Sequence, residues 1–308
     1  MSLDDETRAL LEAVAAAGAP RLHELSPPEA RAAMKGRQAA QPPGPEMARV
    51  VEASVAVDGG RIAVRVLVPA GAPSVTIVFV HGGGWVLDGL GGFDALGRRL
   101  AVAAGAAVVL VDYRVAPEHP FPVPLEDSWS ALGWARTTLP ALVPEAAGLP
   151  VAIGGDSAGG AIAAAIALRA AREGVPLAAQ LLVYPVTDAA LDTPSYLDPE
   201  NQLLVDRATM AWFWDQYVPE AGARGDPAVS PLRDEIPPGL APAVVAVAEH
   251  DVLRDEGEAY AARLVAAGVP VESRRFAGQM HGFLGLAQLP GGEAAFAWIG
   301  AALRRLAP

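Results

Sequence analysis

The sequence of 308 residues contains no cysteine. This absence excludes disulfide bonds, thiolate metal sites and a cysteine nucleophile together. The sequence also lacks an uninterrupted apolar run of the roughly 18 residues that a membrane span needs, because the nearest candidate, residues 161–171, is short and contains Arg169. The start of the chain carries Asp4, Asp5 and Glu6, which is the wrong charge for a secretory leader. We therefore expect a cytoplasmic protein that does not associate with membranes.

Basic residues are scarce as well. Lys and Arg total 23 against 35 Asp and Glu, which gives a net charge of −12. A surface of this sign repels nucleic-acid phosphates and anionic lipid headgroups and suits a neutral substrate. The sequence has no His-Glu-x-x-His motif and no histidine cluster at ligand spacing. We therefore expect no nucleic-acid partner, no metal and no cofactor, and a small neutral molecule as the substrate.

Short, fully apolar runs alternate with helical patterns through most of the chain. Such runs are typical of strands buried on both faces of a parallel sheet, with the intervening helices covering it. An alternating stretch from Val50 to Val68 predicts an antiparallel hairpin before them. The buried strands are expected at residues 75–80, 107–111, 151–153, 179–183 and 243–248, and a last strand is expected at about residues 271–276. The predicted fold class is α/β, with a mostly parallel central sheet flanked by helices.

Two segments break this alternation. Apolar positions at helical spacing from residue 5 to residue 17 predict a helix well before the hairpin. A long insertion with an aromatic helical stretch separates the sixth strand from the seventh. We predict that residues 1–48 form a helical cap segment and that residues 186–232 contribute to the same cap. Residues 49–308 form the main domain in this interpretation.

The glycine-rich run from Gly154 to Gly160 joins an expected strand to an expected helix. Its central five residues fit the Gly-x-Ser-x-Gly nucleophile elbow, which requires a strand, a sharp turn and a helix in this order. Glycines on either side of Ser157 lack a Cβ and allow the strand and the helix to pack closely. The helix N-terminus also favours negative charge near the serine. A turn that needs only flexibility would not require this context, so we predict Ser157 as the catalytic nucleophile.

A serine hydroxyl needs a general base, and the base needs an acid to orient it. In an elbow-type enzyme the acid and then the histidine follow the serine along the chain, each after a later strand. Asp251 and His281 occupy these positions, and we predict them as the acid and the base. The acids that compete with Asp251 are Glu249 and Asp255. The remaining histidines are His23, His81, His119 and His250, which we interpret as surface or packing residues.

A second glycine cluster, His81-Gly82-Gly83-Gly84-Trp85, directly follows the strand at residues 75–80. Glycines let backbone amides turn towards the carbonyl oxygen that becomes negative in a tetrahedral intermediate. We predict an oxyanion hole from Gly82, Gly83 and Gly84, together with the amide of Ala158 just after the nucleophile. A tight turn alone would also explain the glycines, but the serine elbow farther along the chain favours the functional interpretation.

Four ordered motifs together resemble the hormone-sensitive-lipase-like esterases, which form bacterial family IV. The motifs lie at residues 81–85, 113–122, 154–160 and 281–283, and the likeness spans about residues 75 to 285. The resemblance implies an α/β-hydrolase fold with residues 49–308 as the catalytic domain, in the Gly-Asp-Ser-Ala-Gly subgroup. Because family members are often dimers, it also points to a homodimer. The chain departs from the family at Gln279-Met280, where the order of the residues before the histidine differs.

The resemblance implies a serine carboxylesterase that hydrolyses short- to medium-chain esters through an acyl-enzyme intermediate, with a triad of Ser157, Asp251 and His281. The same residues would serve an amidase or a lactonase, and a non-catalytic small-molecule binding protein of the same fold is the remaining alternative. Arg114 and Glu118 are expected to brace the site, and Asp156 to anchor the elbow. The substrate pocket is expected to include Trp85, Tyr184, Met210 and Phe213.

Overall fold

The computed structural model describes residues 2–39, 42–87, 89–286 and 289–306. One 8-stranded sheet has the order β1-β2-β4-β3-β5-β6-β7-β8. The antiparallel hairpin of β1 and β2 pairs with β4 in antiparallel fashion, and the strands from β4 to β8 run parallel to one another. The strands are β1 (Arg49–Val57), β2 (Gly60–Val68), β3 (Val75–Val80), β4 (Ala106–Asp112), β5 (Val151–Asp156), β6 (Gln180–Val183), β7 (Ala243–His250) and β8 (Val271–Met280). The predicted α/β architecture is confirmed.

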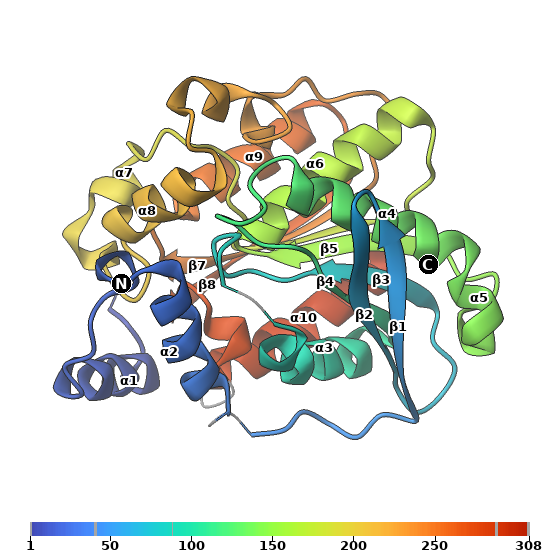
Figure 1. The fold of residues 1–308 in the computed structure, drawn as a ribbon, viewed down its shortest axis with the longest axis horizontal. Helices are drawn as coiled ribbons and strands as arrows, with labels where there is room; N and C mark the ends of the chain where they lie inside the picture. The colour runs from blue at the N-terminus through green and yellow to red at the C-terminus, as the bar shows by residue number, and fades with distance from the viewer. Residues whose placement is uncertain (1, 40–41, 88, 287–288, 307–308) are drawn as a thin grey trace.

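Helices cover both faces of this sheet (Figure 1). Side chains alternate along each strand, so Ile77 and Phe79 of β3 face one layer of helices while Val78 and Val80 face the other. One layer consists of α3 (Leu90–Ala104) and α10 (Pro290–Leu306). The other consists of α4 (Val123–Thr137), α6 (Ala158–Glu173) and α9 (Arg254–Ala266), with the short α5 (Leu139–Leu142) following α4. Both faces are therefore apolar, which explains the uninterrupted hydrophobic strands.

Two strands are longer than the sequence pattern predicts. β5 continues through Gly154 and Gly155 to Asp156, and β8 continues through Gly278 to Met280. Sequence patterns end such strands early because glycine and polar residues have low strand propensity. The longer strands bring the chain directly to Ser157 and His281.

The two segments expected to form a cap lie beside each other at one end of the sheet (Figure 1). Arg21 Nη1 donates a hydrogen bond of 2.7 Å to Asp206 Oδ2, and His23 Nδ1 lies 3.1 Å from Thr209 Oγ1. The helices of these segments are α1 (Asp5–Ala16), α2 (Pro27–Ala39), α7 (Pro194–Leu197) and α8 (Arg207–Tyr217). None of the helices described is both long enough and apolar enough to cross a membrane.

Candidate active site

Ser157 occupies a sharp turn between β5 and α6. Its backbone φ is 55°, a conformation that is unfavourable for residues with a side chain. The neighbouring glycines are required by close packing: a Cβ on Gly155 would lie 2.2 Å from the carbonyl oxygen of Gly159, and one on Gly159 would lie 2.0 Å from the carbonyl oxygen of Val80. The elbow therefore holds the serine at the carboxyl end of the sheet, at the start of a helix.

The three residues expected to cooperate come together at this end of the sheet. Ser157 Oγ lies 2.9 Å from His281 Nε2, and His281 Nδ1 lies 2.8 Å from Asp251 Oδ2. The other oxygen of Asp251 accepts a hydrogen bond of 2.9 Å from the amide of Leu253, and the residue is 1% exposed. A proton on His281 Nδ1 that is donated to this carboxylate leaves Nε2 free to accept the serine proton.

The acids that compete with Asp251, and His81, make contacts outside the triad. Glu249 Oε2 accepts a hydrogen bond of 2.8 Å from the amide of Gly278, and Asp255 Oδ2 accepts one of 2.8 Å from the amide of Ser195. The ring of His81 is stacked between Phe93 and Tyr113, with ring centroids 4.8 and 4.3 Å away. This stack holds the start of the glycine cluster, which agrees with a structural role for His81.

The oxyanion-hole prediction needs one correction. The amide of Gly82 donates a 2.8 Å hydrogen bond to Asp156 Oδ1, so it is already used inside the protein. Gly83 and Gly84 have φ of 103° and 61°, and both line the cavity that contains Ser157. Within the described residues no protein acceptor takes the amides of Gly83, Gly84 or Ala158. Sequence alone could not separate Gly82 from its neighbours, because the direction of each amide depends on backbone angles that any glycine can adopt.

Asp156, the residue before the nucleophile, is a buried carboxyl with 6% exposure. A Cβ on Gly82 would lie 2.6 Å from Asp156 Oδ2, so only glycine allows this close contact. Burial raises the pKa of Asp156 from 3.8 to about 7, although the Gly82 amide and the nearby His281 favour the charged form. Asp156 thus joins the elbow to the glycine cluster, in line with the anchoring role expected for it.

The raised pKa predicts how replacement of Asp156 by Asn changes stability with pH. Because the folded-state pKa is above the unfolded value, the contribution of Asp156 to stability is complete below pH 3.8 and is lost as the pH rises through about 7. Asn does not titrate and keeps an oxygen for the Gly82 amide. Asp156→Asn should therefore gain about 3 kcal/mol in free energy of unfolding, relative to the parent, between pH 5 and pH 8.

Urea unfolding at both pH values measures this difference. Asp156→Leu is the matched control, because it removes the charge and also leaves the Gly82 amide without an acceptor. It should be less stable than Asp156→Asn at each pH by about 1–3 kcal/mol. A difference between parent and Asp156→Asn that does not change with pH would contradict the raised pKa.

A cavity of about 710 Å³ opens beside Ser157 and His281. Tyr184, Met210 and Phe213 line it, as expected from the sequence. The sequence did not identify the aliphatic side chains of the N-terminal segment and of the insertion after β6 that also line it. Among them are Leu10, Leu11, Val14, Leu203, Leu204 and Val205. Their helical spacing was visible for α1, but the pattern does not say what the apolar face of a helix covers.

The prediction for Trp85 was wrong. Its ring is fully buried and stacks on Tyr217 with centroids 4.3 Å apart, beside Trp214 at 4.6 Å. The backbone φ of 61° at this residue turns the side chain into the core. Trp85 therefore fixes the glycine cluster against α8 and packs in the protein interior instead of facing a ligand.

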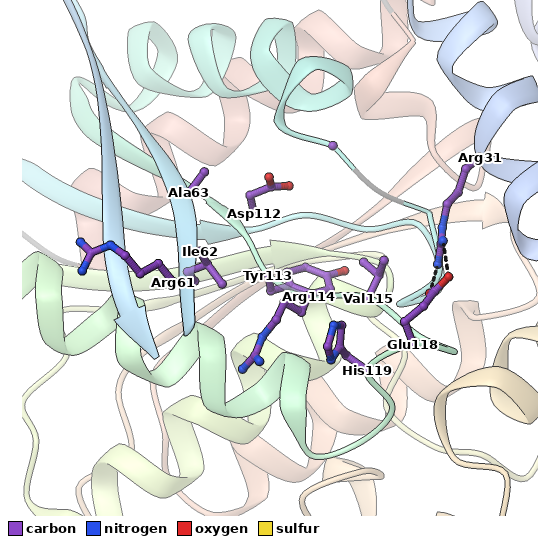
Figure 2. Close-up of a pocket in the computed structure, with 11 residues that line it drawn as sticks. Arg31, Arg61, Ile62, Ala63, Asp112, Tyr113, Arg114, Val115, Glu118 and His119 are labelled. Carbon is purple, nitrogen blue, oxygen red and sulfur yellow. Dashed lines mark hydrogen bonds and ion pairs between the residues drawn. The ribbon is translucent and has the colours of Figure 1, made fainter. Parts of the chain in front are cut away.

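A second pocket, of about 420 Å³, lies where α2, the hairpin and the 113–122 segment meet. Figure 2 shows Arg31 reaching from α2 to Glu118, and this ion pair lowers the pKa of Glu118 to about 2. Arg114 pairs with Asp127 of α4 at 2.7 Å and also donates to the carbonyl oxygen of Asp58. Arg114 and Glu118 therefore connect the hairpin, α4 and α2. The described residues contain no group of three or more His, Cys, Asp or Glu side chains that could hold a metal.

A serine after β5, an acid after β7 and a histidine after β8 of such a sheet define the α/β hydrolases as a class. A family model described as the alpha/beta hydrolase fold matches residues 77–285. Carboxylic ester hydrolase LipN of Mycobacterium tuberculosis is 42% identical over 263 residues, covering 82% of this chain and 69% of the relative. Ethyl acetate hydrolase of Pseudomonas putida is 37% identical over 236 residues, covering 74% of this chain and 73% of the relative.

A solved structure gives the same result. A thermostable esterase from Pseudomonas putida superimposes with a TM-score of 0.89 at 37% identity, covering 100% of this chain and 98% of that chain. The chain belongs to the alpha/beta hydrolase family, and its resemblance to the hormone-sensitive-lipase-like esterases is confirmed.

Proposed function

We propose that this chain is a serine carboxylesterase that hydrolyses short- to medium-chain esters through an acyl-enzyme intermediate. The observation that carries the proposal is the hydrogen-bonded series from Ser157 through His281 to Asp251, which opens on a largely apolar cavity. Relatives whose names describe carboxylic ester and ethyl acetate hydrolysis support the same class of substrate. A cytoplasmic location, a homodimer and a cap of residues 1–48 and 186–232 remain our predictions.

Each step of the reaction uses a group already in place. His281 Nε2 accepts the Ser157 proton as Oγ attacks the ester carbonyl carbon, and Asp251 stabilises the imidazolium that forms. The carbonyl oxygen becomes negative and is stabilised by the amides of Gly83, Gly84 and Ala158, donors of a kind that typically contribute roughly 3 kcal/mol each. The imidazolium then gives its proton to the departing alcohol. Water, deprotonated by the same histidine, releases the acid and restores the serine.

A chain-length series of p-nitrophenyl esters, from acetate to dodecanoate, tests the proposal. We expect the highest kcat/KM between acetate and octanoate, because a cavity of about 710 Å³ limits the length of chain that it can bury. The p-nitroanilide of the preferred acyl group is the matched amide, and we expect it to react at least about 100-fold more slowly because an amine is a poorer leaving group that the histidine must protonate earlier.

Labelling with a fluorophosphonate provides a measurement that does not depend on the choice of ester. The parent should form a covalent adduct at Ser157, because the probe reacts with a serine that its histidine has activated. A chain that forms no adduct and hydrolyses no ester would be a binding protein, and faster anilide than ester hydrolysis would identify an amidase.

A further inference from the structure

We infer that Asp4 is a positioning residue that sets substrate chain-length specificity, because it fixes α1 as a wall of the cavity by attaching it to the strand that leads directly to His281. The inference rests on the proposed esterase function and concerns the substrate cavity of the same site. It arises from Gln279, the position where the chain departs from its family. In this structure the side chain of Gln279 contacts the N-terminal segment.

Asp4 contacts both elements through separate atoms. Its backbone amide donates a 3.1 Å hydrogen bond to the carbonyl oxygen of Gly278, and its carboxylate Oδ2 accepts a hydrogen bond from the side-chain amide of Gln279. The other oxygen, Oδ1, accepts a 2.7 Å hydrogen bond from the amide of Thr7 and so caps the start of α1. One side chain therefore caps the N-terminus of α1 and attaches the helix to β8.

The surface of β8 that contacts Asp4 is closely packed. Gly278 has a φ of 71°, and a Cβ at this position would lie 3.0 Å from the amide nitrogen of Asp4, so the two backbones are in close contact. The side chain of Gln279 is 3% exposed, and a Cβ on Gly291 of α10 would lie 2.2 Å from its amide carbon. Gln279 is thus buried and closely packed against α10.

α1 forms the cavity wall that long substrates contact. Leu10, Leu11 and Val14 line the cavity, whereas the groups that bind the reacting carbonyl belong to the elbow after β5 and to the glycine cluster. The binding of an acetyl ester depends chiefly on the groups that bind the reacting carbonyl. A longer chain must also contact the aliphatic side chains of α1, and the free energy it gains depends on how firmly α1 is held.

Three variants separate the attachment from the helix cap. Asp4→Ala removes the helix cap and the side-chain bond to Gln279, whereas Asp4→Ser keeps a hydroxyl that caps α1 but is too short to reach Gln279 as well. Both variants keep the backbone hydrogen bond from residue 4 to Gly278. Asp5→Asn is the matched control, because Asp5 is the exposed neighbouring acid in the first turn of the same helix. The assays use two series on the full chain: p-nitrophenyl esters from acetate to octanoate, and alkyl acetates from ethyl to octyl.

We expect Asp4→Ala and Asp4→Ser to raise KM for the longest substrate of at least one series by about tenfold, the effect of losing one charge-assisted hydrogen bond. For p-nitrophenyl acetate, kcat and KM should stay within about twofold of the parent, and Asp5→Asn should match the parent throughout. Asp4→Ser overturns the inference if KM is unchanged at every chain length, or if kcat for acetate falls in proportion to kcat for the long esters.

Limited proteolysis tests the attachment without any substrate. Trypsin should cleave after Arg8, within α1, several times faster in Asp4→Ser than in the parent or in Asp5→Asn, because a detached helix opens more often. Equal cleavage rates would overturn the inference even in an active esterase. Faster cleavage in a chain that hydrolyses no ester would instead reject the proposed function and leave the attachment intact.

Discussion

Replacement of Ser157 by Ala should reduce kcat for p-nitrophenyl butyrate by about a millionfold, as happens when the nucleophile of a serine–histidine–acid series is removed. Alanine has no hydroxyl to attack the carbonyl, and no covalent intermediate can form. Gly83 and Gly84 still line the cavity, so the variant should bind ester with a dissociation constant close to that of the parent. Stopped-flow assays of the parent and long incubations of the variant measure the two rates.

The control for this variant is Ser130→Ala. Ser130 lies on the exposed side of α4, where its hydroxyl donates to the carbonyl oxygen of Glu126. The Ser130→Ala variant should keep the activity of the parent and react fully with a fluorophosphonate, whereas Ser157→Ala should not react. If Ser157→Ala retained more than about one-thousandth of the parent rate, another nucleophile would have to be carrying the reaction.

Replacement of Asp251 by Asn should lower kcat about 10,000-fold without unfolding the protein. The structure gives a specific reason for so large an effect. One oxygen of Asp251 accepts the amide hydrogen of Leu253, and the other contacts His281 Nδ1. Asn would keep its single oxygen on the Leu253 amide, which turns its NH₂ group towards His281. Nδ1 must then accept a hydrogen bond, so the ring proton moves to Nε2 and the histidine can no longer take the serine proton.

Asp255→Asn distinguishes this explanation from a general loss of negative charge. Asp255 lies near Asp251 in the sequence but contacts the Ser195 amide and Arg254. We expect Asp255→Asn to keep kcat within about tenfold of the parent, because its contacts stabilise a loop and do not reach the histidine. Comparable losses in Asp251→Asn and Asp255→Asn would contradict the assignment of Asp251 as the orienting acid.

The chemistry of the candidate site could be predicted from sequence because each part is encoded locally. Ser157 and Asp251 each follow a hydrophobic strand, His281 follows the last strand, and parallel strands bring their carboxyl ends to one edge of the sheet. Their convergence therefore needs only the order of the strands, which apolar runs reveal. The glycines beside Ser157 were equally predictable, since close backbone contact leaves no room for any other residue.

The cavity could be predicted only in part because its walls depend on side-chain direction. Trp85 and Phe213 are both aromatic and both belong to candidate segments, yet one is buried in the core and the other lines the cavity. The difference comes from backbone angles at Gly84 and Trp85 that sequence patterns do not determine. The contact between Asp4 and Gln279 was beyond reach for a different reason: it joins residues from opposite ends of the chain.

The contacts of Arg21 with Asp206, the N-cap of α8, and of His23 with Thr209 have a consequence for protein engineering. These contacts join the two cavity walls, the N-terminal segment and the insertion after β6, although the two segments are far apart in the sequence. A chimaera that imports the N-terminal helices of another esterase would present foreign side chains to Asp206 and Thr209. Recombination between relatives should therefore succeed when both segments come from the same parent. The sheet with its three reacting residues can then come from either parent.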